Sequence, residues 1–251
     1  MTTSGRLMAH CKYEALRQLR NWRWMLLTLG WPLFYYFLFV HLNGAKMSIA
    51  GTLWDRYFLM SMAAFSIIGT ALNGLASRVA VERAEGWSRL LQTTPMPPWT
   101  YVTSKIVVQL GLGAVIVVIL FLAGDLGQGV HLSLGMWLGT WLWLTLAVAP
   151  FVALGVLLGL VAGKETAGMA SSAVYFLLSM AGGLWWPIQI MPKFLQHLAQ
   201  WLPTYRLADG AWRMLAGHAP AVKDLALLLG YLVVFTLAAM WVVRRRQAAL
   251  T

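Results

Sequence analysis

Six long stretches of the chain contain no aspartate, glutamate, lysine or arginine, and the charged residues cluster in the gaps between them. These stretches are residues 24–45, 57–77, 106–124, 126–163, 166–192 and 225–243. A helix needs about 20 apolar residues to cross a hydrocarbon core roughly 30 Å thick. A charge at the centre of such a helix costs about 2.5–3.5 kcal/mol on insertion scales. The pattern therefore predicts an all-α integral membrane protein with six transmembrane helices.

The chain leaves little room for a separate soluble domain. Of its 251 residues, 60% are hydrophobic and 11% are charged, whereas about 25% are charged in soluble domains. We therefore expect one membrane domain over residues 1–251. Its expected parts are an amphipathic helix in 1–23, spans one and two in 24–77, a loop in 78–100, spans three to five in 101–184, a broken segment in 185–221, and span six with a basic tail in 222–251.

The distribution of positive charge predicts the topology. With six spans, one set of loops and tails holds 13 lysines and arginines and the other set holds 6. The positive-inside rule places the richer set, with both termini, in the cytoplasm. This topology accounts for the net charge of +11, so we expect no nucleic-acid partner.

Two segments depart from simple spans. Residues 5–22 have the periodicity of an amphipathic helix, which would either anchor span one at the membrane surface or contact a partner. Residues 185–221 contain four prolines among apolar side chains, so we expect short half-inserted or interfacial helices, for example 193–201 and 204–216. This re-entrant segment is the candidate outer gate, with Trp185, Trp186, Pro187, Met191, Pro192 and Phe194 as its residues.

The spans lack the groups that chemistry in a membrane would need. Ionisable residues inside spans are costly and mark function, yet the six stretches contain no acidic or basic side chain apart from histidine. No catalytic motif is present, and Gly159 to Lys164 lacks the spacing of a phosphate-binding loop. We therefore expect no catalytic residue, no metal site and no cofactor in this chain. Energy for uphill transport would have to come from another subunit.

The loop after the second stretch has the pattern of a short amphipathic helix. Glu82 and Glu85 stand near its expected start and Pro95 at its end, and Glu85 and Arg89 form an i, i+4 pair. Such a helix would dock into a partner or lie on the membrane surface.

This loop carries a family resemblance. Glu82-x-x-x-Gly86, followed by Leu90-Leu91, a threonine and Pro95, resembles the permease subunits of type-2 (type V) ABC exporters. The resemblance implies that the loop is a coupling helix, which binds the ATP-binding subunit. The residues assigned to this contact are Glu82, Glu85, Gly86, Arg89, Leu90, Leu91 and Pro95.

The resemblance also implies partners. It predicts a dimer with a second, identical permease and two cytoplasmic ATP-binding subunits, which would bind ATP and magnesium. Cargo would move along the permease interface in a bacterial inner membrane, in contact with membrane lipids. The expected cargo is a small amphipathic or lipid-like molecule, such as a drug or an antibiotic.

Two other functions stay open at this point. The chain could be a passive channel or a structural membrane subunit of a larger complex. It could also be a membrane-embedded, lipid-modifying enzyme, although this would need a cluster of polar groups within the bilayer. Coexpression with an ATP-binding subunit would separate an exporter from either alternative.

Overall fold

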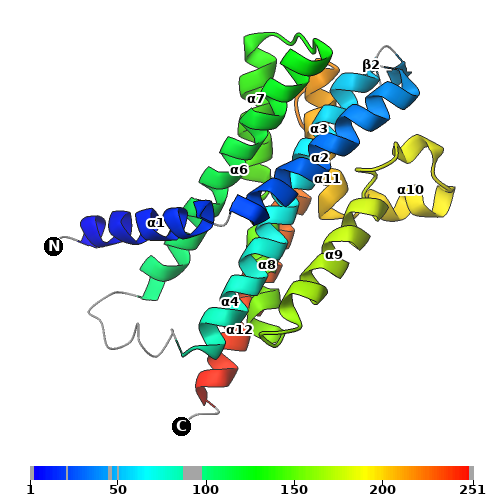
Figure 1. The fold of residues 1–251 in the computed structure, drawn as a ribbon. Helices are drawn as coiled ribbons and strands as arrows, with labels where there is room; N and C mark the ends of the chain where they lie inside the picture. The colour runs from blue at the N-terminus through cyan, green and yellow to red at the C-terminus, as the bar shows by residue number, and fades with distance from the viewer. Residues whose placement is uncertain (1–2, 21, 45–46, 50, 87–97, 249–251) are drawn as a thin grey trace.

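The computed structural model describes residues 3–20, 22–44, 47–49, 51–86 and 98–248, and it is almost entirely helical (Figure 1). Its α-helices are α1 (Thr3–Leu19), α2 (Trp22–Asn43), α3 (Trp54–Gly69), α4 (Leu75–Ala84), α6 (Pro98–Gln128), α7 (Leu134–Ala147), α8 (Ala149–Val161), α9 (Ala167–Ala181), α10 (Lys193–Ala199), α11 (Pro203–Leu215) and α12 (Val222–Ala248). A π-helix η1 (Thr70–Gly74) joins α3 to α4, and a 3₁₀-helix η2 (Ile188–Ile190) precedes α10. An antiparallel hairpin of β1 (Ser48–Ile49) and β2 (Thr52–Leu53), not expected from the sequence, lies between α2 and α3.

Four helical segments within the described residues are long and apolar enough to cross a membrane. They are Trp54–Ala84, Thr103–Gln128, Leu134–Val161 and Val222–Arg245. The first expected span coincides with α2, and the fifth with α9, whose 15 residues rise only about 22 Å. The chain is thus a multi-pass membrane protein, while the total of six spans stays a prediction.

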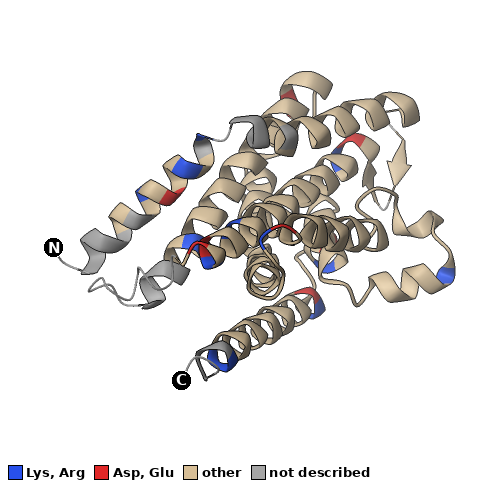
Figure 2. Ribbon diagram, turned by 60° about the horizontal axis from the view of Figure 1, so that its bottom comes forward, with Lys and Arg blue, Asp and Glu red and all other residues tan. Residues whose placement is uncertain are grey.

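The continuous helix α3–η1–α4 is the centre of the bundle. In the most apolar stretch of this helix 89% of the residues are buried. In the corresponding stretch of α12, which lies at the edge of the bundle, only 11% are buried. Helices α2, α6 and α11 pack on α3, and α8 and α9 pack on α4. Figure 2 shows α12 without charge between its two charged ends. The core therefore forms around the second expected span, while the last is largely exposed.

The bundle has two distinct ends. At the α4–α6 end, α4 stops at Ala84 and α6 begins at Pro98. The hairpin end carries β1 and β2 with the α6–α7 and α11–α12 turns (Figure 1). Helix α1 packs on the first part of α6, and the C-terminal end of α12 lies toward the same end of the bundle (Figure 1). The first and last helices thus both reach the α4–α6 end, and the side of the membrane that this end faces stays a prediction.

Two expected spans are interrupted in the structure. The second, expected over 57–77, widens into the π-helix η1 and then continues to Ala84. The fourth, expected over 136–162, breaks at Val148 between α7 and α8, with Pro150 in the first turn of α8. Proline has no amide hydrogen to continue the ladder of hydrogen bonds, which explains this break. Single π-helical turns are often found at functional sites.

The expected broken segment forms the short helices that the sequence indicates. Helices α10 and α11 match the expected 193–201 and 204–216 within a few residues. Pro192 directly precedes α10, and Pro203 is the first residue of α11. Helix α11 enters the bundle, where Leu207, Ala208 and Ala211 are fully buried against neighbouring helices. Its position relative to a bilayer stays a prediction.

Glycines bring α8 into close contact with the central helix. A Cβ on Gly159 would lie 2.6 Å from the carbonyl oxygen of Ala76 and 2.7 Å from Val79 Cβ, and one on Gly155 would overlap the carbonyl oxygen of Ala71. The two glycines are four residues apart, the spacing that lets transmembrane helices approach closely.

We expect Gly159→Leu to lower the free energy of unfolding by more than about 2 kcal/mol, because the added side chain has no space. Thermal unfolding of the purified protein in detergent would measure this. Gly230→Leu is the matched control, because nothing lies within 4 Å of a Cβ there. Equal unfolding temperatures for the two variants would contradict the close packing of α8 on α4.

Candidate functional site

A cluster of buried charges holds the α4–α6 end together. Lys105 Nζ on α6 lies 2.9 Å from Glu82 Oε2 on α4 and 3.3 Å from Glu14 Oε1 on α1. Arg78 Nη1 donates to the same Glu14 oxygen at 2.9 Å, and Arg17 Nη1 donates to Glu82 Oε1 at 3.2 Å. We call these five residues the charge cluster. It joins three helices that are far apart in the sequence.

The burial of this cluster makes its pairing essential. The side chains of Glu14, Glu82 and Lys105 are each at most 6% exposed. An ion taken out of water costs several kcal/mol, so a buried charge is stable only with its partners in place. Arg78 extends the cluster by donating from Nη2 to Gln109 Oε1 at 3.1 Å. Helix α1 is therefore docked on α4 and α6 by the specific contacts of Glu14 and Arg17. Its apolar side chains Met8, Tyr13 and Leu16 are exposed.

A pH dependence follows from Glu14. Burial raises the pKa of its carboxyl, but the charges of Lys105 and Arg78 outweigh this, so the pKa lies below its ordinary value. A carboxyl whose pKa is lower in the docked state than in the undocked state stabilises docking. This stabilisation is complete at pH values above the ordinary pKa of glutamate, and it is lost as the pH falls through the lowered pKa of the docked state.

We therefore expect α1 to loosen in acid, below the ordinary pKa of a glutamate. Cys11 on α1 is the only cysteine of the chain, so a nitroxide attached there reports the motion of α1 by electron paramagnetic resonance. Its mobility should rise as pH falls through the acid range and should be less dependent on pH in Glu14→Gln. Identical profiles for both proteins would contradict this role of Glu14.

The end of α4 is also tied to the turn between α8 and α9. The guanidinium of Arg83 donates to the carbonyl oxygens of Leu160 and Ala162, at the C-terminus of α8. These carbonyl oxygens have no hydrogen-bond partner within the helix, and a cation at this end interacts favourably with the helix dipole. Glu85 forms an exposed ion pair with Lys164 at 3.6 Å. Residues 82–85 thus connect the central helix to α1, α6 and α8.

The structure corrects the expected start of the loop helix. Glu82 lies in the last turn of α4 and Glu85 caps it, so both belong to the end of the second span. Gly86 follows with a φ of +72°, a left-handed conformation that glycine adopts without strain and that ends helices. Arg89, Leu90, Leu91 and Pro95 lie outside the described residues, so their contact with a partner stays a prediction.

A second feature is an aromatic pocket between α2, α3 and α9, with a volume of about 500 Å³. Trp185 packs against Tyr35 and Phe65, with ring centroids 4.9 and 5.5 Å apart. The aromatic pocket is lined by Thr28, Trp31, Pro32, Tyr35, Phe65, Ser66, Gly69, Asn73, Ser172, Tyr175, Phe176 and Trp185. None of these residues is an aspartate, glutamate, lysine, arginine or histidine. Volumes of about 300–1,000 Å³ are typical of ligand sites.

The aromatic pocket also contains polar atoms without partners. Ser66 Oγ and Trp185 Nε1 are buried and make no hydrogen bond within the described part of the chain. In contrast, the hydroxyl of Tyr175 donates to the carbonyl oxygen of Phe65 at 2.9 Å. Buried polar groups normally have partners. The pocket is thus largely apolar, and its wall contains a hydroxyl and an indole N–H that have no partner within the described residues.

The expected outer-gate residues separate into two groups. Trp185 is half-buried in the aromatic pocket, and Pro187 is buried next to it in sequence. Trp186, Pro192 and Phe194 are exposed, and Met191 is half-buried near η2. The structure therefore brings one of the six into the pocket, and a gating role for the others stays a prediction.

The sequence does not reveal the partners of Glu82 or most of the aromatic pocket. From the sequence, Lys105 is explained as one of the positive charges that set the topology. Its position at the start of the third span, 23 residues after Glu82, is only a weak indication that it pairs with Glu82. Ser66 and Tyr175 carry no signal of their own in a hydrophobic span. Within the described residues no group of three or more histidine, cysteine, aspartate or glutamate side chains could hold a metal ion.

Comparison with known proteins decides the family. Residues 54–242 match the model of the ABC-2 family transporter proteins. The chain belongs to the ABC-2 transporter family. This ABC-2 permease is 32% identical over 235 residues to YvfS of Bacillus subtilis (strain 168), whose name describes it as a transport permease, and the match covers 94% of this chain and 96% of YvfS.

A second relative is LnrN of the same organism, named a linearmycin resistance permease. It is 27% identical over 186 residues, which are 69% of the ABC-2 permease but only 45% of LnrN. Both relatives are permeases, so the chain is the membrane subunit of a transporter. The family match confirms the resemblance that the loop motif indicates.

Proposed function

We propose that this ABC-2 permease is the membrane half of an ATP-driven exporter of small amphipathic molecules. A separate cytoplasmic subunit binds ATP and magnesium and docks on residues 82–95. Two permeases and two ATP-binding subunits form the working complex in the bacterial inner membrane, with both permease termini in the cytoplasm.

The observation that carries this proposal is the connection of residues 82–85 to three other helices. Glu82 is paired with Lys105 and Arg17, while Arg83 binds the carbonyl end of α8. A displacement of the adjoining loop would therefore move α1, α6 and α8 together with the central helix. This is what a permease without a nucleotide site of its own needs, because its two states must be biased by a partner.

The cargo site in this proposal is the aromatic pocket. Aromatic faces attract organic cations as well as apolar groups, and Ser66 and Trp185 offer polar contacts that fix orientation. The pocket borders the π-helical turn of the central helix through Asn73. Exposed Trp31, Phe34 and Phe176 lie on the same face, where a second permease would cover it. The resistance named for LnrN favours an antibiotic-like cargo.

Copurification tests the coupling part of the proposal. The permease is coexpressed with the ATP-binding subunit of its gene neighbourhood, and complex yield and ATPase activity are measured. We expect Leu91→Asp to reduce both at least about tenfold, the effect of about 1.4 kcal/mol. Glu165→Arg is the control, because it changes an exposed charge of the nearby α8–α9 turn. Unchanged complex and activity in Leu91→Asp would overturn the proposed docking site.

A further inference from the structure

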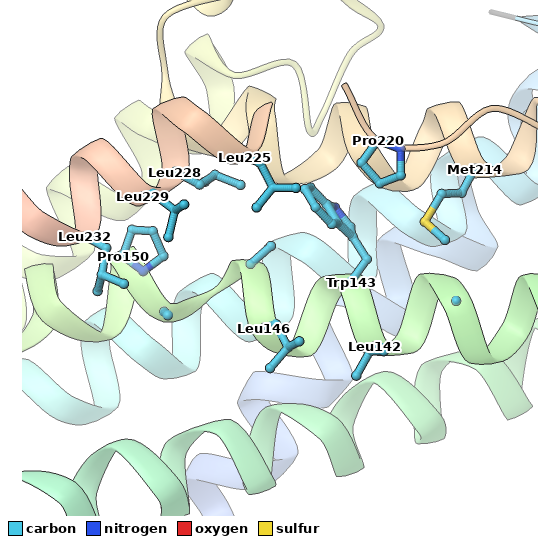
Figure 3. Close-up of a pocket in the computed structure, with 13 residues that line it drawn as sticks. Leu142, Trp143, Leu146, Pro150, Met214, Pro220, Leu225, Leu228, Leu229 and Leu232 are labelled. Carbon is cyan, nitrogen blue, oxygen red and sulfur yellow. The ribbon is translucent and has the colours of Figure 1, made fainter. Parts of the chain in front are cut away.

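An apolar groove lies between α7, α8, α11 and α12, and none of its lining residues comes from α2 or α9 (Figure 3). Its volume is about 430 Å³, and every lining residue is apolar, glycine or the tryptophan Trp143. Trp143 Nε1 already donates to the carbonyl oxygen of Leu207 at 2.8 Å. No hydrogen-bond donor of a lining side chain therefore remains for an occupant, which must be hydrocarbon at this depth.

The shape of the groove is elongated along α12. Leu225, Leu228, Leu229 and Leu232 form one wall, at the spacing of a single helix face over two turns, or about 10 Å. Figure 3 shows Leu228 and Leu229 facing Pro150 across the groove, with Met214 and Pro220 at the opposite end from Leu232. An apolar groove that runs along a spanning helix has a shape that suits an alkyl chain.

The groove exists because the fourth expected span bends. Among the described residues α12 packs mainly on α8 and α11, and the break at Val148 separates α7 from α8. Leaving such a space empty would forfeit the dispersion contacts of its walls, and water does not fill a cavity without polar partners. In a bilayer the available hydrocarbon is a lipid tail.

Charge at the groove's end indicates the kind of lipid. Met214 and Pro220 mark the end nearest the α11–α12 turn, and the exposed Arg213 adjoins it, donating from Nε to Ala219 O at 3.3 Å. Of the acids in the same region, Asp224 is buried and paired with Arg206 at 2.8 Å. Asp209, one turn before Arg213, is half-buried and interacts electrostatically with both Arg206 and Arg213. The groove thus presents an exposed cation where a lipid tail would meet its headgroup, and guanidinium groups bind phosphate well.

We propose that this groove is a specific phospholipid site, in which one acyl chain lies between Trp143 and the leucines of α12 while Arg213 binds the phosphate. The lipid fills the gap between α7 and α12 and holds α12 on the bundle. The site is independent of the proposed transport function, because nothing in it requires ATP or cargo.

Binding of defined lipids to the delipidated full-length chain tests the site. Native mass spectrometry would compare dioleoyl-phosphatidylglycerol with dioleoylglycerol, which has the same chains without phosphate. We expect one tightly held phosphatidylglycerol per chain, bound about fivefold more tightly than the diacylglycerol, the factor that one basic residue near a membrane surface supplies. Arg213→Gln should remove this difference, whereas Lys193→Gln, an exposed cation on α10, should keep it.

The groove itself is tested by filling it. Leu229→Trp should weaken binding of both lipids about tenfold, while Leu237→Trp, an exposed position on α12 outside the groove, should have no effect. Equal affinity in these two variants would overturn the proposal, as would an unchanged preference for phosphate in Arg213→Gln. A further variant carries Leu229→Cys together with Cys11→Ser, so that position 229 holds the only cysteine. If two copies of this variant crosslink and no lipid is retained, the groove is an interface between permeases, and the lipid proposal is wrong.

Discussion

Lys105→Met is expected to lower the free energy of unfolding by about 3–5 kcal/mol, the cost of removing one partner from a buried ion pair. Lys105 is 2% exposed and lies within 3.3 Å of both Glu14 and Glu82. Its loss leaves two buried carboxylates with weakened pairing, so α1 should separate from α4 and α6. Thermal unfolding in nanodiscs measures the stability, and the nitroxide on Cys11 measures the mobility of α1.

The controls for this prediction separate burial from charge. Lys164→Met removes an exposed cation that pairs with Glu85, and surface pairs contribute only about 0–1 kcal/mol. The triple variant Glu14→Gln, Glu82→Gln and Lys105→Met should recover part of the stability, because it leaves no unpaired carboxylate. If Lys105→Met were no more harmful than Lys164→Met, the charge cluster would not hold the α4–α6 end together.

Thr28→Trp is expected to reduce transport at least about tenfold, because the added indole occupies a pocket of about 500 Å³ at its α2 wall. The substitution lies on α2, which contributes no residue to the charge cluster, so binding of the ATP-binding subunit and basal ATPase activity should be retained. The measurement is ATP-dependent uptake of cationic aromatic dyes, ethidium first, into inside-out vesicles that contain the coexpressed complex.

A matched pair of variants makes this result specific. Thr236→Trp places the same side chain on the exposed face of α12 and should transport like the parent protein. Trp185→Phe keeps a ring in the aromatic pocket but removes the unpartnered Nε1, so it should weaken cargo affinity less than Thr28→Trp. Equal transport by Thr28→Trp and Thr236→Trp would exclude the aromatic pocket as the cargo site.

Local rules predict much of this fold from the sequence. The charge-free windows locate α2, α3, α6, α9 and α12, because a bilayer imposes length and polarity on each span separately. Prolines locate the short helices α10 and α11, because the missing amide hydrogen acts at the residue itself. The loop motif leads to the family, which the match over residues 54–242 confirms.

The rest depends on contacts between distant residues. Glu14, Glu82 and Lys105 come from three segments that meet only when the bundle is packed, so their spacing along the chain has no period to detect. The π-helical turn at Thr70–Gly74 likewise has no proline or other local signal in the sequence. The sequence alone predicts that Glu82 begins a docking helix. In the structure Glu82 lies in the last turn of α4, where its partners on α1 and α6 hold it.

Vectorial transport by the reconstituted complex tests the central claim most directly. Inside-out vesicles with permease and ATP-binding subunit should concentrate dye when ATP and magnesium are added, and should fail to do so with either subunit alone or with Leu91→Asp. The opposite result is accumulation of dye by the permease alone under a proton or sodium gradient, which would show that its energy does not come from a nucleotide-binding partner.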